Sequence, residues 1–249
     1  MKYGEIVQLG RHRLMCGDAT KSEDVHALVC GEKVDLVLTD PPYGMKCQKG
    51  TGKIGSDGRV VRNSGIHLDN YYLGARIYPL VIGDDSSDTA RLHYPIARTL
   101  CDRLIFWGGQ YFANFLPVSG AWLFWDKHTG KNNFSDGELA WCSFGNRVRY
   151  YSHMWNGVCM AGSYKLNARG KRARIHPTQK PVELHAHILE DFSHEGDVIL
   201  DCFGGSGTTL IACEITGRKC LMMELSPDYC DVIINRYNTL TEGNIRYDY

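Results

Sequence analysis

Short apolar runs alternate with amphipathic stretches along this chain, and the alternation constrains the fold more than any other feature. The run "VDLVLTD" (34–40) has an apolar centre, with four apolar residues among the five of 34–38, which is typical of a strand buried on both faces. The stretch "KPVELHAHILEDF" (180–192) has helical spacing, with Leu184, Ile188 and Leu189 on one face. Strands that alternate with helices predict an α/β fold with a mostly parallel sheet covered on both faces. Further strands are predicted at 103–109, 120–127, 197–203 and 218–225, and further helices at 88–102, 110–116, 206–217 and 227–240.

The length of 249 residues fits one large domain spanning 1–249. The ten cysteines include no C-x-x-C pair, so we expect buried free thiols in a reducing cytoplasm and no metal site. No apolar run is long enough for a membrane span, and the first residues lack a signal-peptide core. These features predict a cytoplasmic protein without membrane contact.

The net charge is zero, but its distribution is uneven. The segment 146–174 holds seven Lys or Arg and no Asp or Glu, and 44–78 holds six basic residues against two acidic ones. Charge alone fits two solvated loops and a polyanion-binding face equally well.

A glycine-rich turn joins a predicted strand to a predicted helix in "LDCFGGSGTTLIAC" (200–213). Glycine permits close approach to a ligand, and the helix start offers unpaired N–H groups. Glu224 ends the next predicted strand, where an acid can bind ribose hydroxyls. The third glycine of a dinucleotide motif is missing, and the aromatic Phe203 would favour the sulfonium of S-adenosylmethionine. A structural turn and a phosphate or dinucleotide site remain alternatives at this point.

The turn "DPPY" (Asp40, Pro41, Pro42 and Tyr43) ends another predicted strand. Its prolines fix the backbone, so the Asp40 carboxylate and the Pro41 carbonyl can act as fixed acceptors, with the Tyr43 ring as a flat face. Two acceptors and a ring fit a flipped-out nucleobase that carries an amino group. A strand-ending turn capped by an aspartate is the structural alternative.

Together these motifs resemble the amino-methylating DNA methyltransferases that use S-adenosylmethionine. Their target-site motif (D/N/S)-P-P-(Y/F/W) is matched by "DPPY", and their F-x-G-x-G motif by Phe203 to Gly207. "HPTQKPVEL" (176–184), "CGDAT" (16–20) and "WDKHTGKNNFSDGELAW" (125–141) also resemble family sequence. The family usually has D-P-F before the glycines where this chain has Asp201-Cys202-Phe203, which we interpret as a minor departure.

The resemblance implies a doubly wound, Rossmann-like methyltransferase sheet with circularly permuted motif order, typical of the family's beta group. It also implies a target-recognition segment at 127–175 and a mobile basic loop at 44–80 that closes on DNA. Asp40, Pro41, Pro42 and Tyr43 would be catalytic, with Asp40 favouring adenine N6. Cofactor contacts are expected from Asp18, His176, Thr178, Lys180, Asp201, Phe203, Gly205, Ser206, Gly207, Thr208, Thr209 and Glu224. DNA contacts are expected from Lys46, Lys49, Lys53, Arg147, Arg149, Lys165, Arg169, Lys171, Arg172 and Arg174.

The reaction expected from this resemblance is methyl transfer from S-adenosylmethionine to the amino group of a flipped-out adenine in double-stranded DNA, in a bacterial or phage-infected cell. Cytosine N4 is the nearest alternative, followed by an RNA or protein amide substrate. An inactive DNA-binding protein with this fold is the alternative from another class. A homodimer and a separate restriction endonuclease are compatible partners.

Overall fold

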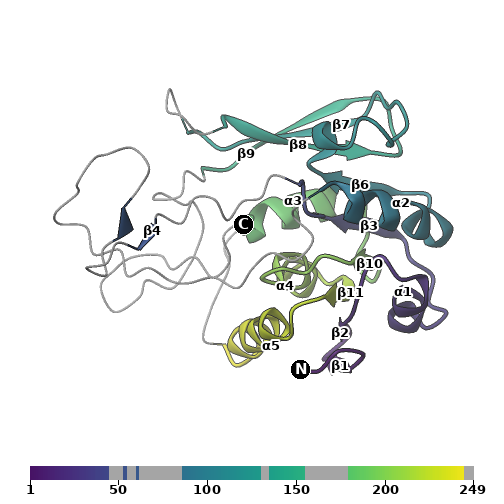
Figure 1. Ribbon diagram of the computed structural model, residues 1–249, viewed down its shortest axis with the longest axis vertical. Helices are drawn as coiled ribbons and strands as arrows, with labels where there is room; N and C mark the ends of the chain where they lie inside the picture. The colour runs from purple at the N-terminus through teal and green to yellow at the C-terminus, as the bar shows by residue number, and fades with distance from the viewer. Residues whose placement is uncertain (45–52, 55–59, 62–85, 130–134, 155–178, 244–249) are drawn as a thin grey trace.

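The structure is a computed structural model that describes residues 1–44, 53–54, 60–61, 86–129, 135–154 and 179–243. These residues form an α/β fold in which helices cover both faces of a nine-stranded sheet (Figure 1). The strand order is β1-β2-β11-β10-β3-β6-β8-β7-β9, and β4 and β5 form a separate pair. The strands are β1 Ile6–Leu9, β2 His12–Cys16, β3 Leu36–Thr39, β4 Lys53–Ile54, β5 Val60–Val61, β6 Leu104–Trp107, β7 Trp122–Asp126, β8 Gly137–Cys142, β9 Val148–Ser152, β10 Val198–Asp201 and β11 Lys219–Glu224.

The five central strands β2, β11, β10, β3 and β6 are parallel, so their carboxyl ends lie along one edge of the sheet. At one end of the sheet β1 pairs antiparallel with β2. At the other, β8 is antiparallel to both β6 and β7, and β9 is parallel to β7. The mostly parallel, doubly wound sheet predicted from the sequence is confirmed.

Two apolar cores lie on opposite faces of the sheet because neighbouring residues of a strand point to opposite sides. Leu36 and Leu38 of β3 pack in the core that includes α3, α4 and α5. Val37 packs in the other core, with α1 and α2 (Figure 1). The helices are α1 Ser22–Val29, α2 Asp88–Leu100, α3 Val182–Phe192, α4 Thr208–Ile215 and α5 Pro227–Thr241.

The order of the two motifs along the chain has a simple structural counterpart. Strand β3, which leads into "DPPY", comes before α2, whereas β10, which leads into the glycine turn, comes after α3. In the sheet these two strands are nevertheless direct neighbours, with Ile199 opposite Leu36 and Leu200 opposite Val37. The fold therefore brings together two motifs that lie far apart in the chain.

Several elements differ from the sequence expectation. The predicted short helix at 110–116 is only a 3-10 turn, η2 Gly109–Tyr111. The segment 127–175, in which the sequence shows no clear periodicity, contains β8 and β9, which extend the main sheet. Strand β9 has no apolar run because it lies at the sheet edge and exposes four of its five residues, whereas β8 has only the short apolar run 139–142 after Gly137 and Glu138. The elements β1, β2 and α1 were not predicted at all.

Among the eight cysteines that the structure describes, none forms a disulfide, and six are buried. Cys30 is exposed and Cys101 is half-buried, so the prediction of buried thiols holds for most of them. Within the described ranges, no helix combines the length and hydropathy that crossing a bilayer requires.

Candidate active site

The candidate site lies where the parallel strands of the sheet end. Asp18 follows β2, Glu224 ends β11, Phe203 follows β10 and Asp40 follows β3. The backbone N–H of Gly17 donates to the Glu224 carbonyl at 3.1 Å, which joins the first two of these ends. Ligands of open α/β sheets bind outside this edge, so the structure gathers both predicted motifs where a ligand is expected.

The glycine turn between β10 and α4 depends on the conformation of Gly207. This residue has φ +81°, and a Cβ added to it would lie 3.0 Å from Cγ1 of Ile233. The Gly207 N–H donates to the Gly204 carbonyl at 2.7 Å, which closes the turn, and α4 begins at the next residue. A side chain at position 207 would therefore strain the backbone and crowd α5.

Asp201 is buried under this turn and organises it. Its Oδ1 accepts from the Thr39 hydroxyl at 2.8 Å and from the Phe203 N–H at 3.1 Å, and its Oδ2 accepts from the Thr209 hydroxyl at 2.6 Å. Burial raises the pKa of Asp201 to about 6, against the opposing effect of these hydrogen bonds. Asp201 was expected to contact a cofactor, but its side chain is 3% exposed and ties β10 to β3 and α4 instead.

The side chains of Ser206, Thr208 and Thr209 are also buried and hydrogen-bonded within the protein. Arg236 donates to both the carbonyl and the hydroxyl of Ser206, and the Thr208 hydroxyl donates to the Lys180 carbonyl at 3.3 Å. These side chains therefore brace the turn. Phe203 and Gly205 are its partly exposed residues, which leaves them as the groups that a ligand can reach.

Glu224 is a partly exposed carboxylate held by the backbone. Its Oε2 accepts from the Gly205 N–H at 2.7 Å and its Oε1 from the Ser226 N–H at 2.8 Å. Burial raises the pKa of Glu224 to about 7, while both N–H groups act in the opposite direction. Each carboxylate oxygen keeps lone-pair capacity for a further donor such as a hydroxyl. Asp18, also partly exposed, accepts from the Thr20 N–H at 2.9 Å.

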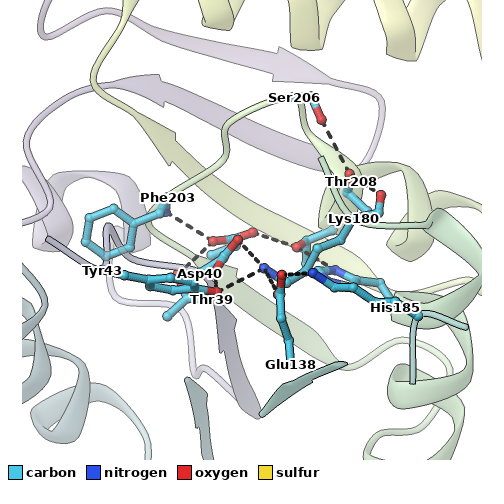
Figure 2. Close-up of polar contacts among 12 residues, drawn as sticks. Thr39, Asp40, Tyr43, Glu138, Lys180, His185, Phe203, Ser206 and Thr208 are labelled. Atoms are coloured by element: carbon cyan, nitrogen blue, oxygen red, sulfur yellow. Dashed lines mark hydrogen bonds and ion pairs between the residues drawn. The ribbon is translucent and has the colours of Figure 1, made fainter. Parts of the chain in front are cut away.

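Asp40 is the centre of a polar cluster at the end of β3 (Figure 2). Its Oδ1 accepts from the Tyr43 hydroxyl at 2.5 Å, and its Oδ2 accepts from the Lys180 ammonium. Lys180 also donates to the Tyr43 hydroxyl oxygen at 3.3 Å. Burial raises the pKa of Tyr43, and the charge of Asp40 adds to this effect, so the phenol stays protonated. The ammonium of Lys180 lies on Asp40, and its contact with a cofactor stays a prediction.

The Tyr43 ring contacts two aromatic neighbours that no motif in the sequence indicates. Tyr111 stacks on it with ring centroids 5.1 Å apart and an interplanar angle of 22°, and Phe112 meets it edge-on at 6.0 Å. A Cβ at Gly108 would lie 2.2 Å from Cε1 of the ring, so only glycine allows this approach. Tyr111 is itself 43% exposed, which adds a second aromatic face to this part of the site.

Glu138 of β8 is a further site residue that was not predicted. Its Oε2 lies 3.3 Å from the Lys180 ammonium (Figure 2). Its Oε1 forms an ion pair with Lys127. Burial alone would raise the pKa of Glu138, but the charges of Lys180 and Lys127 outweigh it and the pKa is lowered. Glu138 lies in the segment "WDKHTGKNNFSDGELAW" (125–141), which resembles family sequence, yet no spacing in the sequence links it to Asp40.

The described basic candidates are few. Arg147, just before the edge strand β9, and Arg149, within it, are both exposed. Of Lys53, in β4, only the backbone is described. Most of the loop predicted at 44–80 also falls outside the described residues. The other predicted site residues outside them are His176, Thr178, Lys46, Lys49, Lys165, Arg169, Lys171, Arg172 and Arg174.

Comparison with known proteins gives consistent matches. A family model described as N6/N4 DNA methylase matches residues 122–236. The chain is 33% identical to the type II methyltransferase M.HpaI of Haemophilus parainfluenzae, over 93% of this chain and 76% of that protein. The crystal structure of the M1.HpyAVI–SAM complex superposes on this chain with a TM-score of 0.51 and 19% sequence identity. The match covers 90% of this chain and 98% of the M1.HpyAVI chain. PvuII DNA methyltransferase, which is cytosine-N4-specific, has a TM-score of 0.54 at 16% identity, covering 97% of both chains. At such identities the two structures show a likeness of fold.

Proposed function

The chain belongs to the N6/N4 DNA methylase family, and from this premise we propose that it methylates the exocyclic N6 amino group of adenine in double-stranded DNA, with S-adenosylmethionine as the methyl donor. One observation carries the proposal. The turn with the amino-group acceptor Asp40 and the glycine turn follow neighbouring strands, linked by the 2.8 Å hydrogen bond from Thr39 to Asp201. A methyl acceptor bound at the first turn would therefore lie beside a methyl donor bound at the second.

The residues at the glycine turn fit S-adenosylmethionine. Glu224 would accept hydrogen bonds from the ribose hydroxyls, because its oxygens have spare lone-pair capacity beside two backbone donors. The partly exposed ring of Phe203 would lie near the cofactor, whose positive sulfonium an aromatic face favours. Asp18 would contact the adenine of the cofactor, because its neighbour Gly17 is hydrogen-bonded to the end of β11, where Glu224 would bind the ribose. When bound, the cofactor supplies an electrophilic methyl group.

Asp40 would orient the target amino group. The nitrogen lone pair of an exocyclic amine is delocalised into the ring, so it is a weak nucleophile until its hydrogens are held by acceptors. The Asp40 carboxylate and the Pro41 carbonyl would hold those hydrogens and direct the lone pair at the methyl group. As the nitrogen–carbon bond forms, the carbon–sulfur electron pair goes to sulfur, and the amino proton leaves to Asp40 or to water.

The target base would have to leave the duplex, which costs a few kcal/mol. The aromatic faces of Tyr43 and Tyr111 would stack on the extruded base and offset part of this cost. Asp rather than Ser at position 40 favours adenine over cytosine, and identifying the methylated base decides between these two substrates.

Phosphate contacts would come from the two basic segments. Arg147 and Arg149 are exposed, so they can reach a DNA backbone. Strand β8 lies between β6 and β7, whereas β9 is an exposed edge strand, so we assign target recognition to the part of 127–175 that follows β8. The basic loop at 44–80 would close on the bound DNA. We further propose that the protein acts in the cytoplasm of a bacterial or phage-infected cell. A homodimer and a separate restriction endonuclease are compatible partners.

The variant Asp40→Ala tests the proposal. Methyl incorporation into DNA should fall by at least about a hundredfold, because both the orientation and a proton acceptor are lost. The affinity for S-adenosylmethionine should stay close to the wild-type value, since Asp40 is not among the residues assigned to the cofactor. Undiminished methyl incorporation in this variant would overturn the mechanism.

A further inference from the structure

The ammonium of Lys180 has three oxygen neighbours. It donates to Asp40, lies 3.3 Å from the Tyr43 hydroxyl oxygen and lies 3.3 Å from Oε2 of Glu138. Its side chain is only 5% exposed, so water cannot replace a lost partner readily. Burial alone would lower the pKa of Lys180, but the two carboxylates outweigh burial and raise it, so the group stays charged.

Glu138 extends this cluster to a second cation. Lys127 pairs with the other oxygen of Glu138 and also lies over the Trp125 ring, 4.8 Å from its centroid. The four groups Asp40, Glu138, Lys180 and Lys127 then carry two negative and two positive charges, which balance. A charge left unpaired in such surroundings is strongly unfavourable, so removing one member affects the others.

The proposed reaction places a demand on this cluster. Both Asp40 oxygens already accept hydrogen bonds, from Tyr43 and from Lys180. A target amino group that binds Asp40 must share or displace these donors, and a displaced Lys180 needs another acceptor. Glu138 is the second carboxylate within reach of the same ammonium.

We propose that Glu138 is a positioning residue for methyl transfer, which keeps the Lys180 ammonium paired while Asp40 turns its lone pairs to the target amino group. This inference rests on the proposed function. Glu138 contacts neither the base nor the cofactor in this proposal. Glu138 acts through Lys180, and Lys127 in turn stabilises the charge of Glu138.

A matched control separates this role from simple stabilisation. Glu32 is also a half-buried carboxylate that binds two cations, Arg13 and Lys219, and its side chain is 27% exposed against 22% for Glu138. Its partner Lys219 begins β11, so Glu32 lies at the opposite edge of the sheet from the site. Loss of either charge should affect stability similarly, but only loss of Glu138 should affect transfer.

The test measures single-turnover methyl transfer with saturating DNA and S-adenosylmethionine. Glu138→Gln should lower the rate at least about tenfold, or about 1.4 kcal/mol, with cofactor affinity changed less than about twofold. Glu32→Gln should change the rate less than about twofold. With Lys180→Met already present, adding Glu138→Gln should have little further effect, because its role depends on Lys180. Equal rate losses in Glu138→Gln and Glu32→Gln, or equal effects of Glu138→Gln with and without Lys180→Met, would overturn the inference.

Two further measurements make the outcome decisive. If Glu138→Gln does not fold, Glu138→Asp keeps the charge on a shorter side chain, and it should retain cofactor binding while losing transfer rate. The ¹⁵Nζ resonance of Lys180 should shift in Glu138→Gln and stay in place in Glu32→Gln, and an unmoved resonance in both refutes the pairing. A wild-type protein that methylates no DNA refutes the proposed function, whereas an active wild type with an unaffected Glu138→Gln variant refutes this inference alone.

Discussion

Cofactor affinity should depend on pH through Glu224, and the structure sets both the direction and the size of the effect. Burial raises the pKa of Glu224 to about 7, from an ordinary value of 4.5. Ribose hydroxyls donate hydrogen bonds, so they favour the ionised carboxylate over the protonated acid. Affinity for S-adenosylmethionine should therefore increase as pH rises through about 7 and should decrease below it.

The magnitude follows from the ionised fraction of Glu224. With a pKa of about 7, roughly one molecule in eleven is ionised at pH 6 and about ten in eleven at pH 8. If the cofactor binds only the ionised form, its Kd should be about tenfold weaker at the lower pH, or about 1.4 kcal/mol. The backbone donors Gly205 and Ser226 are present at both pH values, so they do not supply the difference.

Isothermal titration of the protein with S-adenosylmethionine across this pH range measures the effect. The variant Glu224→Gln is the control, because it removes the titrating group while any titration of the cofactor itself is retained. This variant should bind more weakly at pH 8, by about tenfold, and should lose most of the pH dependence. A wild-type Kd that stays constant across the pH range would refute the assignment of Glu224 to the ribose. An equally large pH dependence of the Kd in Glu224→Gln would also refute it.

Three further predictions concern the turn, the aromatic cluster and the DNA-facing edge. Asp201→Ala should lower the free energy of unfolding by about 3 kcal/mol in urea titrations, since three donors, two of them buried, lose their acceptor. A loss below about 0.5 kcal/mol would contradict the organising role of Asp201. Gly108→Ala should lower kcat about tenfold with cofactor affinity retained, because a Cβ would displace the Tyr43 ring. An unchanged kcat would show that the position of this ring does not matter for methyl transfer. Combined Arg147→Ala and Arg149→Ala should weaken DNA binding and reduce the salt slope by about two, whereas an unchanged slope would exclude phosphate contacts at β9.

The sequence was most informative where an element is buried on both faces. Apolar runs such as Leu36–Thr39 and Val198–Asp201 predicted the central parallel strands, because each must satisfy two cores at once. It was least informative at the ends of the sheet. The strand Val148–Ser152 has no apolar run, since it lies at an edge and exposes most of its side chains.

The site was predictable only in part, for a related reason. Short motifs predicted Asp40, Phe203 and Glu224 as site residues, and the structure places all three at one edge of the sheet, because they follow or end strands that the pattern already placed. The roles of side chains within a motif depend on tertiary contacts, so the sequence could not show that Asp201 is turned inward. The pairing of Lys180 with Glu138 joins two segments that no local spacing connects, and only the folded sheet brings them together.

The central claim, methyl transfer to the amino group of adenine in DNA, is tested most directly by identifying the product. The purified protein is incubated with methyl-labelled S-adenosylmethionine and unmethylated DNA, which is then digested to nucleosides and analysed by mass. The account predicts label on N6-methyladenine, absent when Asp40→Ala replaces the wild type. Label on N4-methylcytosine would contradict the base assignment, and no labelled base from a protein that binds the cofactor would contradict DNA as the substrate.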